Sequence, residues 1–222
     1  ALTFFMTIHA ASGQWLAGWA YRVPVVIDNS AGSALTDYQI KVSLTSFPWT
    51  HVKSDGSDIR FTSANGTSTI PFWVETWNYS TSAEIWVRVP SIGAGTIATV
   101  YLYYGNASAG SASNGVNTFD FFDDFGQGSI DYSKWVRIGS PALSVVLDNG
   151  NYALRVVGPN QHFYYLASIN ETFTDFVFET KVKMQADLNN QCTPEIAFRY
   201  TDESNNYITM LRGDALSDLF IR

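Results

Sequence analysis

Hydrophobic and polar residues alternate in three successive segments near the middle of the chain, separated by short turn-prone clusters. Alternation with a period of two is typical of β-strands that bury one face. The pattern therefore predicts strands at 70–77, 83–90 and 96–104, paired as an antiparallel meander, with Pro90 ending the second strand.

The first two of these strands each have one apolar face and one aromatic and charged face. The apolar face comprises Ile70, Phe72, Val74, Ile85, Val87 and Val89, and the opposite face comprises Trp73, Glu75, Trp77, Glu84, Trp86 and Arg88. Since the apolar residues suffice for a core, the aromatic and charged face is available for another role.

The rest of the chain also predicts strands, and no long segment has apolar residues at helical spacing, so we expect an all-β fold. Further strands are predicted at 19–29, 38–44, 59–61, 118–125, 134–138, 144–147, 152–157, 163–169, 175–184, 195–200 and 207–211. A run of small residues at 107–117 predicts a linker between two β-sandwich or jelly-roll domains, 19–106 and 118–222. The second domain is expected to be incomplete.

The first residues, 1–13, combine a short apolar run with small residues, as at the end of a secretory signal peptide. An edge strand is the alternative interpretation. Asn65, Asn78, Asn106 and Asn170 lie in sequences that match the glycosylation acceptor pattern and are compatible with an exterior location. We therefore expect an extracellular or cell-surface protein.

Charge and cysteine content narrow the classes of partner. The chain has 20 acidic and 13 basic residues, a formal net charge of −7, and no basic cluster that could neutralise phosphates. We therefore expect neither nucleic acid nor an anionic membrane surface as a partner. We also expect no segment to insert into a membrane. The single cysteine, Cys192, allows no intramolecular disulfide and leaves the redox compartment undecided.

The aromatic and charged face provides a candidate ligand site. Trp73, Trp77 and Trp86 could stack on sugar rings, which have an apolar face, while Glu75 and Arg88 could bond to the hydroxyl groups. The alternative is that the indoles pack against a loop or a neighbouring domain, because cross-strand aromatic pairs stabilise sheets without binding a ligand. Both interpretations stay open.

Clustered aspartates provide candidate calcium ligands, because that ion prefers carboxylate oxygens. Alternation places Asp120 and Asp124 on one side of a predicted strand and Asp123 on the other. Asp55 and Asp58 form a second pair. In both places the alternative is a structural carboxylate that bonds to nearby backbone, and no other cofactor is expected.

The sequence contains no recognisable catalytic set. Glu171 and Asp175 are four residues apart, and no carboxylate pair has the context expected of a glycosidase. His9, His51 and His162 are scattered and lack metal-binding spacing. We therefore expect a non-catalytic protein.

Six ordered motifs in the first half resemble domain of unknown function 2341, a family found in secreted and surface proteins of archaea and bacteria. The motifs are WAYR at 19–22, LTDYQ at 35–39, SDIRF at 57–61, PFWVE at 71–75, IWVRVP at 85–90 and YLYYGN at 101–106. The resemblance covers residues 19–110. It implies no catalytic residues, because none is established for that family.

The second half resembles the opening of concanavalin A-like lectin/glucanase domains, including laminin G-like ones, through FFDDF at 121–125 and DYSKW at 131–135. The resemblance covers residues 119–222 and implies a jelly roll used in binding carbohydrate or protein, and in some members in glycoside hydrolysis. The Glu-x-Asp-x-x-Glu signature of the glucanases is absent.

The leading functional hypothesis is a non-catalytic extracellular binding or adhesion module within a larger secreted or cell-surface protein. Its expected partner is a glycan or another cell-surface polymer. Two alternatives stay open: an accessory region of a secreted glycoside hydrolase, and a structural spacer or assembly subunit.

Overall fold

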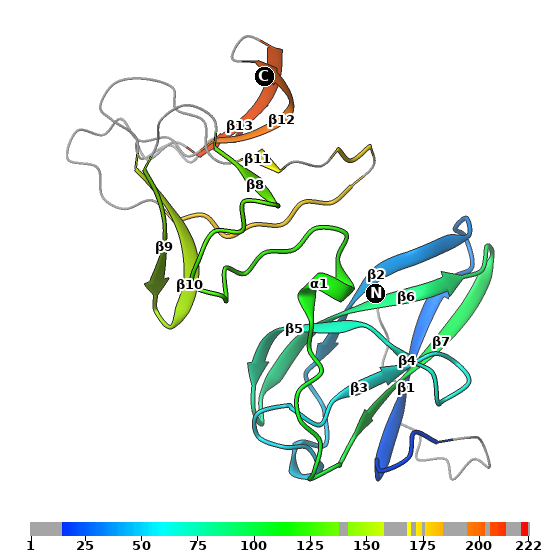
Figure 1. Cartoon of the computed structure of the whole chain (residues 1–222). Coiled ribbons are helices and arrows are strands. Elements are labelled where there is room, and N and C mark those ends of the chain that lie inside the picture. Colours follow the sequence, from blue (N-terminus) through cyan, green and yellow to red (C-terminus); the bar gives the residue numbers. More distant parts are fainter. Residues whose placement is uncertain are drawn as a thin grey trace. The chain divides into compact units, whose positions relative to one another are not determined.

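The computed structural model describes residues 15–137, 142–157, 168–169, 172–174, 176–183, 195–202, 205–211 and 219–221. The chain forms two compact units, Ala1–Asp124 and Phe125–Arg222 (Figure 1). Nearly every regular element described is a strand, so the all-β prediction is confirmed. The possible signal remnant at 1–13, Cys192 and Asn170 lie outside the described residues.

The first unit is a sandwich of two antiparallel sheets. Its strands are β1 (Tyr21–Asn29), β2 (Leu35–Leu44), β3 (Arg60–Thr62), β4 (Thr69–Ile70), β5 (Phe72–Asn78), β6 (Ser82–Ile92) and β7 (Thr96–Tyr104). Sheet 1 has the order β1-β7-β3-β4, and sheet 2 has the order β2-β6-β5. A single turn of 3-10 helix, η1 (Trp49–His51), follows β2.

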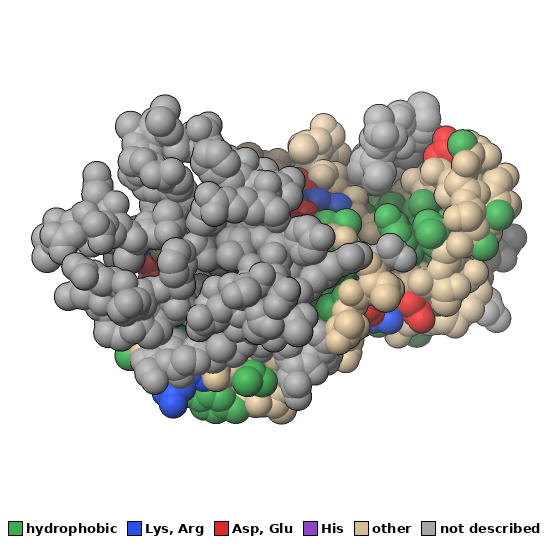
Figure 2. Space-filling view, turned by 90° about the horizontal axis from the view of Figure 1, so that it is seen from above, with side chains coloured by type: hydrophobic (Ala, Val, Ile, Leu, Met, Phe, Trp, Pro, Cys, Tyr) green, Lys and Arg blue, Asp and Glu red, His purple; other side chains and the backbone are tan. Residues whose placement is uncertain are grey.

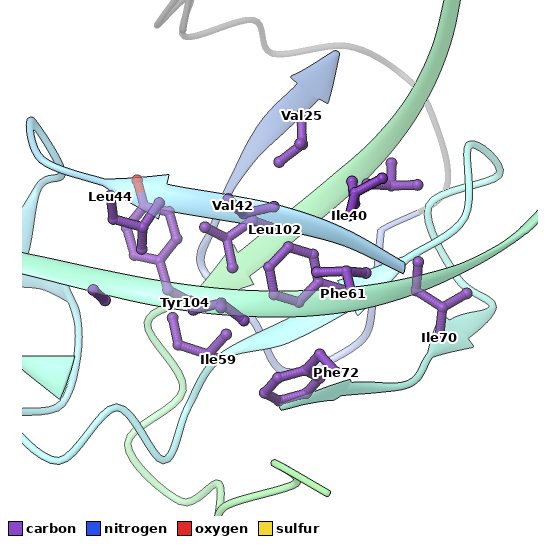
Figure 3. Packing of buried hydrophobic residues seen from close by; sticks show 14 of the residues in the cluster. Val25, Ile40, Val42, Leu44, Ile59, Phe61, Ile70, Phe72, Leu102 and Tyr104 are labelled. Carbon is purple, nitrogen blue, oxygen red and sulfur yellow. The ribbon is translucent and has the colours of Figure 1, made fainter. Parts of the chain in front are cut away.

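Alternate residues of both sheets form one core, as Figure 3 shows for Phe61, Leu102 and Val42. The buried cluster is Val25, Ile40, Val42, Leu44, Phe47, Val52, Ile59, Phe61, Ile70, Phe72, Ala83, Ile85, Val87, Val89, Ile92, Val100, Leu102 and Tyr104. Removal of this apolar surface from water is the main force that holds the two sheets together. Among the predicted core residues, all but Val74 are buried, and Val74 packs against the cluster.

The predicted meander is correct for the pairing of β5 with β6, but it is wrong for Ile70, which lies in β4 of sheet 1, and for β7. The chain crosses to the opposite sheet after β6, and β7 pairs with β1 and β3 instead. Pro90 does not end β6, which continues to the buried Ile92 before the turn. Residues 96–104 have the alternation of a strand in either sheet, so the pattern alone could not assign the sheet.

The prediction of a strand at 118–125 is wrong. The short helix α1 (Gly115–Thr118) ends at the first residue of this segment, and residues 119–125 contain no strand. Asn114 caps this turn, because its Oδ1 accepts the backbone N–H of Asn117 at 3.0 Å. The Thr118 hydroxyl donates to the Asn114 carbonyl at 2.8 Å and is buried with its residue.

Residues 107–117, the predicted linker, are held against the first unit. The Asn114 N–H donates to the Phe72 carbonyl at 2.8 Å, and the Val74 N–H donates to the Ser113 hydroxyl at 2.8 Å. These bonds use backbone groups on the free edge of β5. The boundary between the two units therefore lies farther along the chain, after Asp124.

The second unit contains further antiparallel sheets. Its described strands are β8 (Trp135–Val136), β9 (Ala142–Asp148), β10 (Asn151–Val157), β11 (Ser168–Ile169), β12 (Glu195–Asp202), β13 (Asn205–Leu211) and β14 (Leu219–Ile221). They form the sheets β10-β9, β11-β8 and β12-β13-β14. The predicted strands at 144–147, 152–157, 195–200 and 207–211 are confirmed.

The predicted strand at 175–184 is wrong in its described part, because residues 176–183 pair with no other described strand. Val177 is 88% exposed, so its apolar alternation does not reflect a buried face. Within the described ranges, no helix has the length and apolar character required to cross a bilayer.

Candidate functional site

A β-bulge at Glu75 separates the three predicted tryptophan platforms. Trp73 is opposite Trp86 in the β5–β6 pairing, but beyond the bulge Thr76 is opposite Glu84 and Trp77 is opposite Ala83. An extra residue in one strand moves every later side chain to the other face. The prediction that Trp77 shares a face with Trp73 and Trp86 is therefore wrong.

Trp73 and Trp86 lie together on the outer face of sheet 2, as predicted. Trp86 Nε1 donates to Glu75 Oε2 at 3.0 Å, and Lys41 Nζ lies 3.1 Å from the same oxygen. Lys41 Nζ also lies 5.2 Å from the centroid of the Trp86 ring, over its face. Lys41 therefore occupies ring surface that a stacked sugar would need.

Two phenylalanines from the segment after α1 cover the same indoles. The Phe119 ring centroid lies 5.8 Å from that of Trp73 and 5.7 Å from that of Trp86, both edge to face. Phe122 adds a third contact, 5.0 Å from Trp73. The outer face of sheet 2 is thus a packed aromatic cluster, the arrangement expected if the indoles cover the sheet against a neighbouring segment.

The predicted polar residue Arg88 forms ion pairs within the first unit. Its Nη1 lies 3.0 Å from Asp120 Oδ1, and its Nε lies 3.6 Å from Asp37 Oδ1. Figure 2 shows acidic and basic side chains close together on one face of the molecule. The guanidinium of Arg88 therefore joins a strand of sheet 2 to the segment after α1.

The candidate calcium ligands do not form a metal centre in the part of the chain that the structure describes. Asp120 pairs with Arg88, and no group of three His, Cys, Asp or Glu side chains is positioned to hold an ion in the described ranges. Calcium binding generally needs six or more oxygen ligands. The described residues do not supply such a set around Asp120 and Asp124.

Asp55 and Asp58 bond to backbone, as the structural interpretation of this pair predicts. Asp55 Oδ1 accepts the Ser57 N–H at 3.0 Å, and this bond lowers the pKa of Asp55. Asp58 is 1% exposed, and its Oδ1 accepts the Lys53 N–H at 3.0 Å. Asp58 Oδ2 accepts the N–H groups of Gly105 and Asn106 at 2.8 and 3.2 Å.

Trp77 belongs to a row of aromatic rings near the turns that join β2 to β3. We call this the aromatic row, and its members are Trp77, Tyr79, Trp49, Phe47, Tyr104, Tyr21 and His51. Neighbouring ring centroids in the row are separated by 4.5 to 6.2 Å. η1 provides both Trp49 and His51, so one helical turn contributes rings at two points of the row.

Gly56 allows Trp77 to pack at its position in this row. The φ of Gly56 is +67°, and a Cβ atom there would lie 2.8 Å from the indole. Both features favour glycine, which adopts positive φ without steric cost. Trp77 Nε1 also donates to the Ser54 carbonyl at 2.9 Å, so the indole is fixed by its ring and by its nitrogen.

The end of the row at Tyr21 and His51 borders an open pocket of about 280 Å³. The pocket is lined by Tyr21, Thr50, His51, Val52, Lys53, Asp58, Gly105 and Ala107. The Tyr21 ring is stacked on that of His51 with centroids 4.5 Å apart, and Tyr21 is 39% exposed. Exposed rings, a hydroxyl group and an ammonium group therefore meet around one hollow.

Burial of Tyr104, whose ring is stacked with that of Tyr21, makes stability depend on pH in the alkaline range. Burial raises the pKa of Tyr104 from 10.0 to about 12, with a smaller contribution from Tyr21. A raised folded-state pKa contributes stability that is complete below the unfolded-state value and is lost as the pH rises through the folded-state value. We expect the free energy of unfolding to fall between pH 10 and 12.

Denaturant titrations at several pH values, followed by tryptophan fluorescence, measure this loss. Tyr104→Phe should lose less stability than the wild type over the same interval, because phenylalanine cannot ionise. Tyr38→Phe, which changes an exposed tyrosine, is the matched control. Identical alkaline loss in Tyr104→Phe and the wild type would contradict the assignment to Tyr104.

Sequence reasoning missed the pocket because its residues come from separate segments. Tyr21 begins β1, His51 and Lys53 follow β2, and Gly105 follows β7. In the sequence, metal binding is the role that His51 suggests, and the spacing of the histidines does not support it. The signal that could have found this site is the apolar and aromatic run around Trp49, which lies between two strands instead of within one.

Residues 55–138 match the family described as domain of unknown function (DUF2341). The match supports the resemblance expected from the sequence over 55–110, and it extends beyond that range through β8 in the second unit. No curated protein matches the chain. No solved structure matches it either.

Proposed function

We propose that this chain is a non-catalytic binding module of a larger secreted or cell-surface protein, and that its ligand is a carbohydrate. The observation that carries the proposal is the pocket beside the stacked rings of Tyr21 and His51. We further propose that the second unit is a concanavalin A-like jelly roll, on the strength of its sequence motifs and its antiparallel sheets.

The pocket combines the two kinds of group that sugars need. A sugar ring has an apolar face that packs on aromatic rings, and the Tyr21–His51 stack supplies such a surface. Its hydroxyl groups need donors and acceptors, and Thr50 and Lys53 line the same hollow. This site replaces the outer face of sheet 2 as the candidate platform, because Phe119 covers the indoles there.

The proposal of a non-catalytic role rests on the bonding of Asp58, the only carboxylate among the described residues that line the pocket. Glycoside hydrolysis generally uses two carboxyl groups that flank the scissile bond. Asp58 accepts backbone N–H groups from Lys53, Gly105 and Asn106, so its oxygens are already engaged. The pocket is therefore suited to holding a sugar and not to cleaving one.

The first test is binding of the full chain to a glycan array, followed by affinity electrophoresis in soluble polysaccharides. We expect His51→Ala to weaken binding about threefold to tenfold, the loss that follows removal of one aromatic contact. Tyr38→Ala, which removes an exposed ring from β2, should bind like the wild type. The fold should survive both changes because both side chains are exposed.

Two outcomes would overturn the proposal. One is the absence of wild-type binding to every glycan and polysaccharide tested. The other is equal binding by His51→Ala and the wild type, which would place any sugar site elsewhere on the chain.

A further inference from the structure

A second pocket in the first unit has chemistry different from that of the first. Its volume is about 260 Å³, and it shares no lining residue with the pocket at Tyr21. It is lined by Arg60, Thr69, Ile70, Pro71, Phe72, Ala112, Asn114 and Asn117. Arg60 is the only charged residue in this set, so the lining has a net positive charge.

Among the residues that the structure describes, the guanidinium of Arg60 contacts only neutral groups, and its Cζ lies over the Trp19 ring, 5.2 Å from the ring centroid. Its Nη1 donates to the carbonyls of Ser57 and Ile59 at 3.1 and 2.6 Å, and its Nη2 donates to the Gly110 carbonyl at 2.6 Å. No carboxylate in the described part of the chain lies within ion-pair distance of Arg60. A partly buried cation in this state gains more from an anion than a fully hydrated one would.

Partial burial makes the charged form of the Arg60 guanidinium less stable than it is in water, which favours binding of an anion. Partial burial lowers the pKa of Arg60, and the nearby charge of Asp58 acts in the opposite direction. Arginine stays charged at neutral pH in spite of this shift. Part of the cost of desolvating the cation therefore remains to be offset by a bound anion.

Neutral polar groups surround the same hollow. The Thr69 hydroxyl, the Asn114 side-chain NH2 and the Asn117 side-chain amide make no hydrogen bond within the described residues. Ile70 and Phe72, which are buried, provide an apolar floor. A pocket with an apolar floor and a few converging polar groups is typical of a small-molecule site.

We propose that this pocket binds the carboxylate of an acidic sugar, with Arg60 as the group that recognises the anion. The guanidinium donates to the carboxylate, while the ring of the sugar lies over the apolar floor and its hydroxyl groups meet Thr69 and the two asparagines. The identity of the ligand as a saccharide rests on the proposed function, whereas the recognition of a carboxylate does not.

Titration of the full chain with D-glucuronate, D-glucose and acetate, each followed by calorimetry, tests the proposal at low ionic strength. We expect D-glucuronate to bind more tightly than D-glucose or acetate, and its affinity to fall as salt is added. Arg60→Gln should weaken D-glucuronate binding by about tenfold or more, because it removes a charge-assisted bond. Arg155→Gln removes the same charge from an exposed site in the second unit and should have no effect.

A second variant guards against loss of structure in Arg60→Gln, since that guanidinium also bonds to three carbonyls. Asn117→Asp adds a negative charge at an exposed residue of the pocket and should weaken D-glucuronate binding by a similar factor. Unchanged D-glucuronate affinity in Asn117→Asp, or equal affinity for D-glucose and D-glucuronate, would overturn the proposal.

The remaining outcomes separate this proposal from that for the first pocket. Acetate that binds as tightly as D-glucuronate would overturn the saccharide as the ligand. His51→Ala should leave D-glucuronate affinity unchanged, because His51 lines the other pocket. Loss of D-glucuronate binding in His51→Ala, with normal binding in Arg60→Gln, would assign the sugar to the first pocket alone.

Discussion

Asp58→Ala is expected to lower the free energy of unfolding of the first unit by about 3–5 kcal/mol. The carboxylate is buried and accepts backbone N–H groups from Lys53, Gly105 and Asn106. Alanine would remove the shared acceptor of these three donors at a position that is only 1% exposed, and an unpaired buried donor costs about 1–3 kcal/mol. Denaturant unfolding followed by tryptophan fluorescence reports on this unit, because every tryptophan except Trp135 lies in it.

Asp55→Ala is the matched control for this substitution. Asp55 is exposed and accepts the N–H of Ser57 in the same turn region, so its removal should cost much less stability than the removal of Asp58. If Asp58→Ala and Asp55→Ala destabilised the protein equally, the buried bonds of Asp58 would contribute nothing beyond an ordinary turn contact.

Trp77→Ala is expected to cost about 2–4 kcal/mol, because the indole packs against the core cluster and against Trp49. It also loses the bond from Nε1 to the Ser54 carbonyl. A solvent-facing sugar platform would lose far less on truncation, so the size of the effect distinguishes the two roles. Thermal and denaturant unfolding of the full chain measure it.

Tyr79→Ala provides the comparison, because Tyr79 also contacts Trp49 but is 43% exposed. We expect a loss below about 1 kcal/mol for this change. A small effect of Trp77→Ala, equal to that of Tyr79→Ala, would show that the bulge at Glu75 does not direct the indole into the packed interior.

The alternation of residues predicted β5 and β6 well, because side chains on a pleated strand alternate whatever the partner strand is. It could not predict the bulge at Glu75, which depends on how both strands pair. That single inserted residue decides whether Trp77 faces outward or joins the aromatic row. The error about Trp77 is therefore one of register and not of strand assignment.

The segment at 118–125 shows the opposite error. Its phenylalanines have the spacing of a strand, but Phe119 and Phe122 pack on Trp73 and Trp86 instead of forming a ladder. An aromatic residue can cover the face of a sheet equally well from a loop and from a strand. The apolar pattern identified the phenylalanines that pack against the sheet. The cap by Asn114 instead favours a helical turn at the start of the segment, where the pattern predicted a strand.

The sequence could not predict the two candidate pockets, because residues from several separate segments line each of them. Arg60, Thr69 and Asn117 converge only because β3, β4 and the segment after β7 meet at one edge of the sandwich. Tyr21 and His51 likewise meet only in the folded chain. A spacing rule applies to neighbours on one element, whereas both pockets join several elements.

The pairing of β1 with β7 also has a mechanical consequence. The two strands are antiparallel with Tyr21 opposite Tyr104, so the start of β1 and the end of β7 lie at the same end of the sandwich. A pulling force applied at Tyr21 and Tyr104 separates the residue pairs of the ladder one after another and does not load all pairs at the same time. The bonds that Asp58 accepts from the N–H groups of Gly105 and Asn106 lie just beyond the first pair. These bonds therefore hold the end of β7 in place until they break, and only then is the first pair of the ladder loaded.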